Sequence, residues 1–223
     1  MGEGMTNYFS IAIDGPVGVG KSTTARLTAK KLGFMHIDSG AMYRATTFFL
    51  IEKGINIHDE AAVNAVIKDM EVNFDDIQNV YVNGVNVTKK IRTQQISDST
   101  SIVSPYPQVR EKLVGLQREL AKKHNVVMDG RDIASVVLPS ANLKIYLDAD
   151  IDIRAKRRLD ELQSKGQKAD FKKVKNETII RDERDMNRKE SPLIKVSDAI
   201  VIDTGNKSIE EVVAEIVELC EFR

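Results

Sequence analysis

Four residues near the start of the chain have types and a spacing that suit phosphate chemistry. Gly15, Gly20, Lys21 and Ser22 fit the pattern G-x-x-x-x-G-K-[ST], between an apolar run and a helical one. In such a loop, backbone N–H groups and a helix N-terminus present positive potential to phosphate oxygens. Lysine reaches the outer phosphates, and the hydroxyl suits Mg²⁺. A glycine-rich turn without a ligand is the alternative, but the strand–loop–helix context favours a nucleoside triphosphate site. That site comprises Gly15, Pro16, Val17, Gly18, Val19, Gly20, Lys21, Ser22 and Thr23.

Several classes of nucleotide-binding protein carry such a loop, and other signatures distinguish them. A GTPase needs N-K-x-D to read guanine, but the Asn206-Lys207 pair continues to Ile209 where the aspartate belongs. No D-x-x-G follows the loop. A motor domain would need on the order of a hundred more residues. A kinase of a small molecule remains.

Such a kinase needs cations around the phosphoryl group in transfer, because catalysis there is mainly positioning and charge stabilisation. Two helical segments supply them: Arg154, Arg157 and Arg158 within 150–162, and Arg181, Arg184 and Arg188 within 179–192, where Asp185 lies between arginines and can hold them in place. Solvated helix faces with ion pairs are the alternative for either cluster alone. The polar segment between them contains Gly166, so we expect a lid over 156–176.

A further acidic candidate, Asp129, ends the apolar run "NVVMD". At the end of a strand it is placed to orient a magnesium-bound water, as a Walker B acid does. We therefore expect Ser22 directly, and Asp129 through water, to hold the metal. Arg131 and Asp132 follow in the next turn.

Alternating strands and helices must position these residues. Five short β-branched runs end in aspartate, at Asp14, Asp38, Asp129, Asp148 and Asp203. The pattern predicts an α/β fold of the P-loop NTPase type, a five-stranded parallel sheet with helices on both faces. Aspartate caps helices and closes strands, which accounts for most of the five, and two or three are expected to face the site.

Helix signals and an insertion complete the expected organisation. Gly33 is placed to end the helix after the loop, and Ser208 with Glu211 forms a capping box for the last helix. Residues 70–91 suggest short antiparallel strands with a turn at Asn83-Gly84. We expect a core of 1–64, 109–155 and 177–223, an inserted monophosphate-binding subdomain over 65–108, and the lid.

Composition narrows the partners and the compartment. The 223 residues include 33 Lys+Arg and 33 Asp+Glu, which argues against a nucleic-acid polymer as partner. One cysteine, Cys220, favours a reducing cytoplasm, and no apolar run reaches the length of about 18 residues that a membrane span needs. The three histidines lack zinc-ligand spacing. The expected partners are small molecules, and the expected state is a monomer.

Several motifs carry a resemblance to a known family. "IDGPVGVGKST", "DSGAMYR", "IRTQQIS", "VREKL", "DGRD", "VVLP", the "RRL" helix and "RDERDMNR" with "SPL" occur in this order from Phe9 to the last helix. Together they resemble the bacterial-type cytidylate kinases. "DSGAMYR" with "DGRD" is the most specific combination, since adenylate kinases carry other sequences there. The middle insertion resembles that family's enlarged monophosphate-binding region.

The resemblance implies roles for individual residues. Ser39, Tyr43 and Arg44 would line the monophosphate pocket, and Ser101, Arg110 and Asp132 would read cytosine. Arg131 and Arg188 would hold phosphate, Arg181 and Asp185 would touch sugar and phosphate, and Arg157 and Arg158 match the lid arginines. Lys21, Arg131, Arg157, Arg158 and Arg188 would be the catalytic cations. One departure is Ala134-Ser135, where the family usually has Gly-Thr.

The resemblance also implies the reaction, transfer of the γ-phosphoryl group of ATP to CMP or dCMP with Mg²⁺. Direct in-line transfer without a covalent intermediate is expected, because the acceptor phosphate is already nucleophilic. The alternatives are a kinase of another monophosphate or of a small hydroxyl-bearing metabolite, and a nucleotide-gated binding module.

Overall fold

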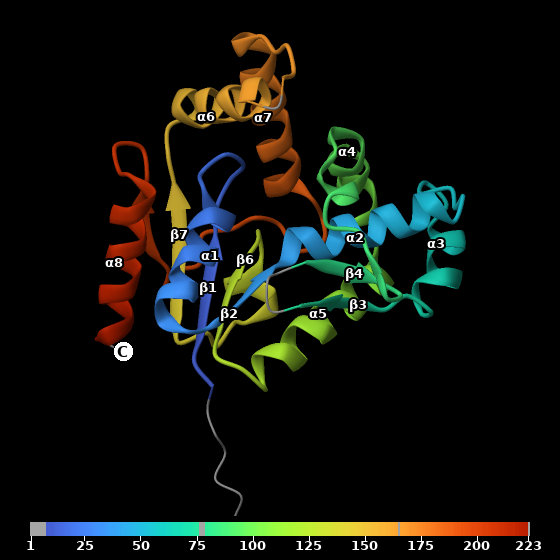
Figure 1. Cartoon of the computed structure of the whole chain (residues 1–223), viewed down its shortest axis with the longest axis horizontal. Helices are drawn as coiled ribbons and strands as arrows, with labels where there is room; N and C mark the ends of the chain where they lie inside the picture. The colour runs from blue at the N-terminus through green and yellow to red at the C-terminus, as the bar shows by residue number, and fades with distance from the viewer. Residues whose placement is uncertain (1–7, 76–78, 165, 223) are drawn as a thin grey trace, which may run out of the picture. The chain divides into compact units, whose positions relative to one another are not determined.

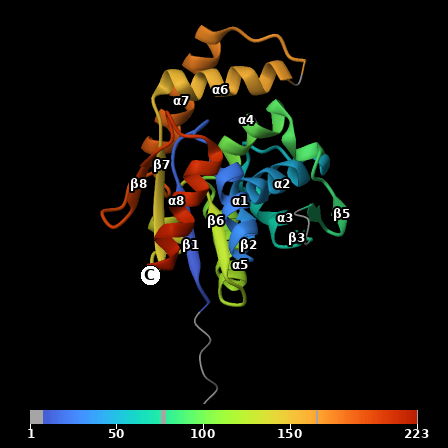
Figure 2. The ribbon, with the colours of Figure 1, turned by 60° about the vertical axis from the view of Figure 1, so that its left-hand side comes forward.

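The computed structural model describes residues 8–75, 79–164 and 166–222. The chain forms two compact units, one of Met1–Ile37 with Leu120–Arg223 and one of Asp38–Glu119 (Figures 1 and 2). The first seven residues of the expected core, residues 76–78 of the expected insertion and residue 165 of the expected lid lie outside the described residues.

The first unit is built on a five-stranded parallel sheet, which confirms the predicted fold class. Its strands are β1 (Ser10–Asp14), β2 (Met35–Asp38), β6 (Val126–Asp129), β7 (Leu143–Asp148) and β8 (Ile200–Asp203). Their order across the sheet is β2-β6-β1-β7-β8, with the loop-bearing strand in the centre. Each strand ends at the aspartate that the sequence predicts.

The helices of this unit include those that the sequence signals predict, together with an unpredicted turn of π-helix. They are α1 (Lys21–Leu32), the short π-helix η2 (Ile133–Val137), α6 (Ile151–Ser164), α7 (Phe171–Asn187) and α8 (Ile209–Glu221). Gly33 ends α1 with a φ of 68°, and Ser208 and Glu211 form the reciprocal capping box of α8. These caps confirm both sequence signals.

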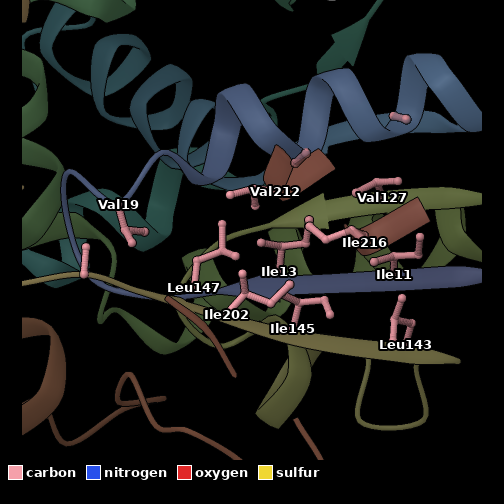
Figure 3. Packing of buried hydrophobic residues seen from close by; sticks show 13 residues of the cluster. Ile11, Ile13, Val19, Val127, Leu143, Ile145, Leu147, Ile202, Val212 and Ile216 are labelled. Atoms are coloured by element: carbon pink, nitrogen blue, oxygen red, sulfur yellow. The ribbon is translucent and has the colours of Figure 1, made fainter. Parts of the chain in front are cut away.

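Apolar packing fixes α1 against the sheet. Ile13, Leu147 and Ile202 from the strands meet Val212 and Ile216 from α8 in one buried cluster, to which α1 contributes Ala25 and Ala29 (Figure 3). Burying a side chain such as isoleucine stabilises a fold by about 1.5–3 kcal/mol. The cluster therefore holds the N-terminus of α1, which carries Lys21, at the carboxyl end of β1. Cys220 packs at the edge of the cluster.

The second unit contains the segment that interrupts the alternation. Its elements are α2 (Ser39–Glu52), α3 (Glu60–Ile67), β3 (Val72–Phe74), β4 (Val80–Val82), β5 (Val85–Asn86), the 3-10 turn η1 (Lys90–Arg92), α4 (Gln94–Val103) and most of α5 (Pro107–Ala121). The strands β3-β4-β5 are antiparallel, and Asn83 and Gly84 turn the chain with φ values of 48° and 78°. This confirms the predicted hairpin.

We find no helix among the described residues that combines the length and the apolar character needed to cross a membrane.

Candidate active site

The phosphate loop between β1 and α1 passes very close to the backbone of β7. A Cβ atom at Gly15, where φ is 150°, would lie 2.2 Å from the carbonyl oxygen of Leu147. No side chain fits at that distance, so only glycine lets the loop leave β1 in this direction. At the other end, Gly20 forms the left-handed N-cap of α1, and the helix begins at Lys21.

Lys21 is buried at the head of α1. Its Nζ donates a hydrogen bond of 2.5 Å to the carbonyl oxygen of Pro16, and the residue is 7% exposed. Burial lowers the pKa of Lys21 well below its usual value, and the charge of Arg131 lowers it further. Asp129, Asp185 and Asp14 oppose this shift. A polyanion bound here would restore the charged ammonium group, because an opposite charge favours the charged form.

Ser22 and Asp129, 107 residues apart in sequence, meet beside the loop. The Ser22 hydroxyl donates to Asp129 Oδ2 over 2.6 Å, and His36 Nε2 lies 2.7 Å from Asp129 Oδ1. A hydroxyl and a carboxylate are both hard oxygen donors of the type that Mg²⁺ prefers alongside substrate phosphates. This donor set fits the expected magnesium ion.

Asp14, at the end of β1, connects the base of the loop to η2. Its two oxygens accept the N–H groups of Ile133 and Ala134 over 3.0 and 2.8 Å. Burial raises the pKa of Asp14 to about 6, with a smaller contribution from Asp132, against the effect of the two hydrogen bonds and of Lys21. Asp14 thereby fixes the segment that follows Arg131 and Asp132.

The departure at Ala134-Ser135 lies in this segment. Ala134 is buried and donates to Asp14, and its φ is not positive. The backbone here adopts a conformation open to any L-residue, so it does not require the glycine that the family usually has.

Arg131 and Asp185 form a partly buried ion pair, with Arg131 Nε donating to Asp185 Oδ2 over 2.8 Å. Burial alone would lower the pKa of Arg131, but the charge of Asp185 and their hydrogen bond raise it. Burial likewise acts to raise the pKa of Asp185, and Arg131 outweighs it, so that pKa is lowered. Both groups stay charged at neutral pH. Arg181 lies partly buried on the same helix as Asp185.

Arg188 lies just beyond the end of α7, although the sequence pattern places it on the helix. Its Nε donates to the carbonyl oxygen of Ser191 over 2.6 Å, and its NH2 group is 3.7 Å from Asp132 Oδ1. Ser191 has a φ of 50°, and Pro192 follows. The chain therefore turns sharply here and brings Arg188 beside the buried carboxylate of Asp132.

The two predicted lid arginines differ in their surroundings. Arg157 donates to both oxygens of Thr204, to Oγ1 over 3.0 Å and to the carbonyl over 2.6 Å. Thr204 is buried and contacts Val19 of the phosphate loop through its hydroxyl. Arg158 makes an ion pair with Glu161 on the helix surface. Arg157 is thus tied to the loop region through Thr204.

The second unit holds the other five predicted acceptor residues, Ser39, Tyr43, Arg44, Ser101 and Arg110. Ser39 begins α2 after Asp38, which caps the helix by accepting the N–H of Ala41. Arg44 donates to the same Asp38 over 3.1 Å. The buried guanidinium of Arg110 lies 5.8 Å from the ring centre of Tyr43, and Ser101 donates to the carbonyl oxygen of Asp98.

Each unit therefore brings part of the predicted site together. The first places Lys21, Ser22 and Asp129 at one end of the sheet and pairs Arg131 with Asp185 and Arg188 with Asp132. The second pairs Tyr43 with Arg110. The three residues expected to read cytosine are divided, with Ser101 and Arg110 in one unit and Asp132 in the other. Their roles as a set stay predictions.

Sequence reasoning missed three residues of the first unit. His36 lies beside Asp129 because β2 and β6 are neighbours, which sequence spacing does not reveal. The sequence predicted Asp14 as the end of a strand, but it did not predict the hydrogen bonds that Asp14 accepts from η2. Asp182 lies beside Arg181, and its only signal was an acidic residue in an arginine-rich helix.

Comparisons with known proteins identify the family of this chain. The family model described as cytidylate kinase matches residues 11–221. The cytidylate kinase of Lactobacillus johnsonii is 45% identical over 222 residues, covering 98% of this chain and 96% of its own. That of Pediococcus pentosaceus is 44% identical over 220 residues, covering 97% of each chain. The crystal structure of an uncharacterized protein from Eubacterium ventriosum matches with a TM-score of 0.56 at 15% identity, over 96% of this chain and 99% of its own.

The solved structure supports the fold alone at that identity. The family model and the relatives match almost the whole chain, from the strand before the phosphate loop to the last helix. The chain belongs to the cytidylate kinase family.

Proposed function

We propose that this chain transfers the γ-phosphoryl group of ATP to CMP or dCMP, giving ADP and CDP or dCDP. The observation that carries this is the phosphate loop at the head of α1, where Lys21 is buried and Ser22 bonds Asp129, in a chain of the cytidylate kinase family. Arg131 lowers the pKa of the buried Lys21, so the two charges oppose each other. A fold keeps such a pair where a polyanion binds between or beside the charges.

Positioning and charge stabilisation would account for most of the catalysis. The acceptor phosphate is already an anion and needs no strong general base. Lys21 would bind the outer phosphates of ATP, and Arg131, Arg157, Arg158 and Arg188 would stabilise the charge that spreads over the transferred group.

The magnesium ion would neutralise charge on the phosphates. Ser22 would hold it directly, and Asp129 through a water molecule. His36 and the Ser22 hydroxyl fix both oxygens of Asp129, so the carboxylate is already oriented.

We assign the acceptor by analogy with the family. Ser39, Tyr43 and Arg44 would line the monophosphate pocket, and Arg181 and Asp185 would touch sugar and phosphate. Ser101, Arg110 and Asp132 would read the base. The buried Asp132 supports a base contact, because an ionised carboxylate accepts hydrogen bonds and cytosine offers its amino group.

The segments around this site would have separate tasks. Residues 65–108 would form the monophosphate-binding subdomain, and 156–176 would form a lid that closes over the phosphates. The exposure of residues 166–168 and 170, between α6 and α7, supports the lid. We propose a monomer that acts in the cytoplasm on small molecules.

One assay tests the function. ADP release from Mg²⁺-ATP is measured with a panel of CMP, dCMP, UMP, AMP and GMP. We expect turnover with CMP or dCMP at least about a hundredfold above the others in kcat/KM. If another monophosphate is turned over as well as CMP or better, that monophosphate is assigned as the substrate instead. If no acceptor changes the rate of ADP release, a nucleotide-gated binding module is favoured.

A further inference from the structure

Two buried side chains that the proposed mechanism does not use hold the phosphate loop. Asp182 on α7 and Arg154 on α6 are 5% and 9% exposed, and they form an ion pair. Asp182 Oδ1 accepts the backbone N–H of Val17 over 2.9 Å. Arg154 NH1 donates to the carbonyl oxygen of the same Val17 over 3.0 Å. Both polar backbone groups of one loop residue are therefore bound by side chains.

The base of α6 packs against the loop at the next residue. A Cβ atom at Gly18, where φ is 77°, would lie 2.9 Å from the carbonyl oxygen of Arg154. The guanidinium of Arg154 is held in turn by the carbonyl oxygen of Ala149, to which Nε donates over 2.9 Å. Arg154 therefore touches the loop through its backbone and its side chain together.

We propose that Asp182 and Arg154 are positioning residues that set the shape of the phosphate loop for nucleotide binding. A loop that binds phosphate through backbone N–H groups works only if those groups point toward a common centre. Asp182 accepts a hydrogen bond from the N–H of Val17, and Arg154 donates one to its carbonyl oxygen. The two bonds fix the orientation of the peptide units on either side of Val17. The remaining N–H groups of the loop are thereby aligned before the nucleotide arrives.

Stability alone is a weak explanation for this pair. The free energy of desolvating two buried charges offsets most of their attraction. Proteins in which apolar residues replace such a pair are often as stable as the original. A role in orienting the backbone of the loop explains why each of the two charged groups also binds Val17. The same contacts anchor the α6 and α7 ends next to the loop, so any movement of the proposed lid lies between Arg154 and Asp182.

The proposal rests on the nucleotide site of the proposed function, and its test is binding rather than turnover. We would measure the Kd of ADP by calorimetry, without acceptor, for Asp182→Ala, Asp182→Asn, Arg154→Met, Arg154→Lys and the double variant Asp182→Ala/Arg154→Met. We expect every variant to bind ADP at least about tenfold more weakly, since each loses a charge-assisted bond. Among the kinetic constants, KM for ATP should rise, and KM for CMP should change less than about twofold.

The double variant separates positioning from stability. It leaves no uncompensated buried charge, so its Tm should exceed that of Asp182→Ala, while its ADP affinity stays reduced. If Tm and affinity recover together, or if any folded variant binds ADP as the wild type does, the proposal is overturned. Asp182→Asn keeps the shape of its side chain, Arg154→Lys keeps the positive charge without the planar guanidinium, and both carry the test if the larger changes do not fold.

Asp152→Asn is the matched control. Asp152 on α6 makes an ion pair with Lys175 on α7 over 2.5 Å, so its loss weakens the same helix pair. The ion pair joins the two helices and includes no residue of the phosphate loop. The affinity of Asp152→Asn for ADP should therefore equal that of the wild type. A wild type that binds ADP but does not phosphorylate CMP would fail the proposed function alone, whereas a wild type that binds no ADP would overturn both.

Discussion

The ammonium group of Lys21 donates to the carbonyl oxygen of Pro16 inside the phosphate loop, over 2.5 Å. The lysine thus contributes to the shape of the loop as well as to its charge. Its burial costs free energy, since burial lowers its pKa.

The substitution Lys21→Met separates catalysis from stability. We expect kcat to fall by about 10²–10³, the usual loss for one electrostatic stabiliser. The Tm should not fall, because a buried charge is replaced by an apolar side chain of similar length. Lys30→Met on the exposed face of the same helix is the control and should leave both unchanged. Near-normal turnover in Lys21→Met would rule out the phosphate-loop mechanism.

Substitutions of the two lid arginines should differ in their effects on kcat and Tm. Arg157→Met should lower both kcat and Tm, because Arg157 makes two hydrogen bonds to the buried Thr204. Arg158→Met should lower kcat and change Tm less, since a partly exposed ion pair such as Arg158–Glu161 contributes about 0–1 kcal/mol. Lys156→Met, on the exposed face of α6, should change neither. Steady-state kinetics and thermal unfolding of the three variants decide this, and a kcat unchanged in both arginine variants would contradict their catalytic role.

Asp14 should make the stability of the protein depend on pH. Its pKa rises from 3.8 to about 6 on folding, so the folded state favours the protonated form. The corresponding stabilisation is complete below about pH 4 and is lost as the pH rises through 6. Relative to Asp14→Asn, the wild type should therefore lose about 2 kcal/mol of unfolding free energy between pH 4 and pH 7.

Urea unfolding at several pH values measures this difference. The control is Asp69→Asn, which removes an exposed aspartate of the second unit. If the difference in unfolding free energy between Asp14→Asn and the wild type does not change with pH, Asp14 has the same pKa in the folded and unfolded chain.

Asp132 should select the base. UMP would set its O4 atom against the carboxylate, whereas CMP offers an amino group. Asp132→Asn keeps the shape and lets the amide present a donor. We expect CMP activity to fall and the CMP/UMP ratio of kcat/KM to narrow by at least about tenfold.

The competing explanation is that Asp132 only balances the charge of Arg188, 3.7 Å away. In that case the ratio stays constant while both activities fall. Asp160→Asn, which removes an exposed ion pair with Lys156, is the control for the loss of one carboxylate.

The connection between α6 and α7 should respond to ligand. Residues 166–170 are mostly exposed, and Asp170 begins α7 as its cap. A bisubstrate analogue should slow hydrogen exchange across 156–176, because a closing lid loses contact with water. Peptides of α8, which packs in the core, should exchange alike with and without the analogue. Unchanged exchange over 156–176 would count against a lid.

Local signals predicted most of the fold. Short β-branched runs ending in Asp14, Asp129 or Asp203 marked strands, and Ser208 with Glu211 marked a helix start, because these signals act over a few residues. The strand order β2-β6-β1-β7-β8 depends on long-range packing and could not be obtained in this way. Helix α4 was also missed: Thr93 caps it by accepting the N–H of Ile96, but its polar residues give no clear apolar stripe.

The candidate site shows the same division. The motif placed Lys21 and Ser22, and the strand end placed Asp129. Spacing on α6 grouped Arg154 with Arg157 and Arg158, and only the folded chain reveals that Arg154 is buried against Val17. Which cation faces a ligand and which holds the backbone depends on residues far apart in sequence.

The position of Cys220 offers a chemical reporter of folding. It is the one cysteine of the chain, packed at the edge of the core near the end of α8, and burial raises the pKa of its thiol. Thiol reagents attack the thiolate, so alkylation of the folded protein should be slow and should accelerate when the last turn of α8 opens. The reaction rate then follows the fraying of one helix end at a single atom, with no engineered label.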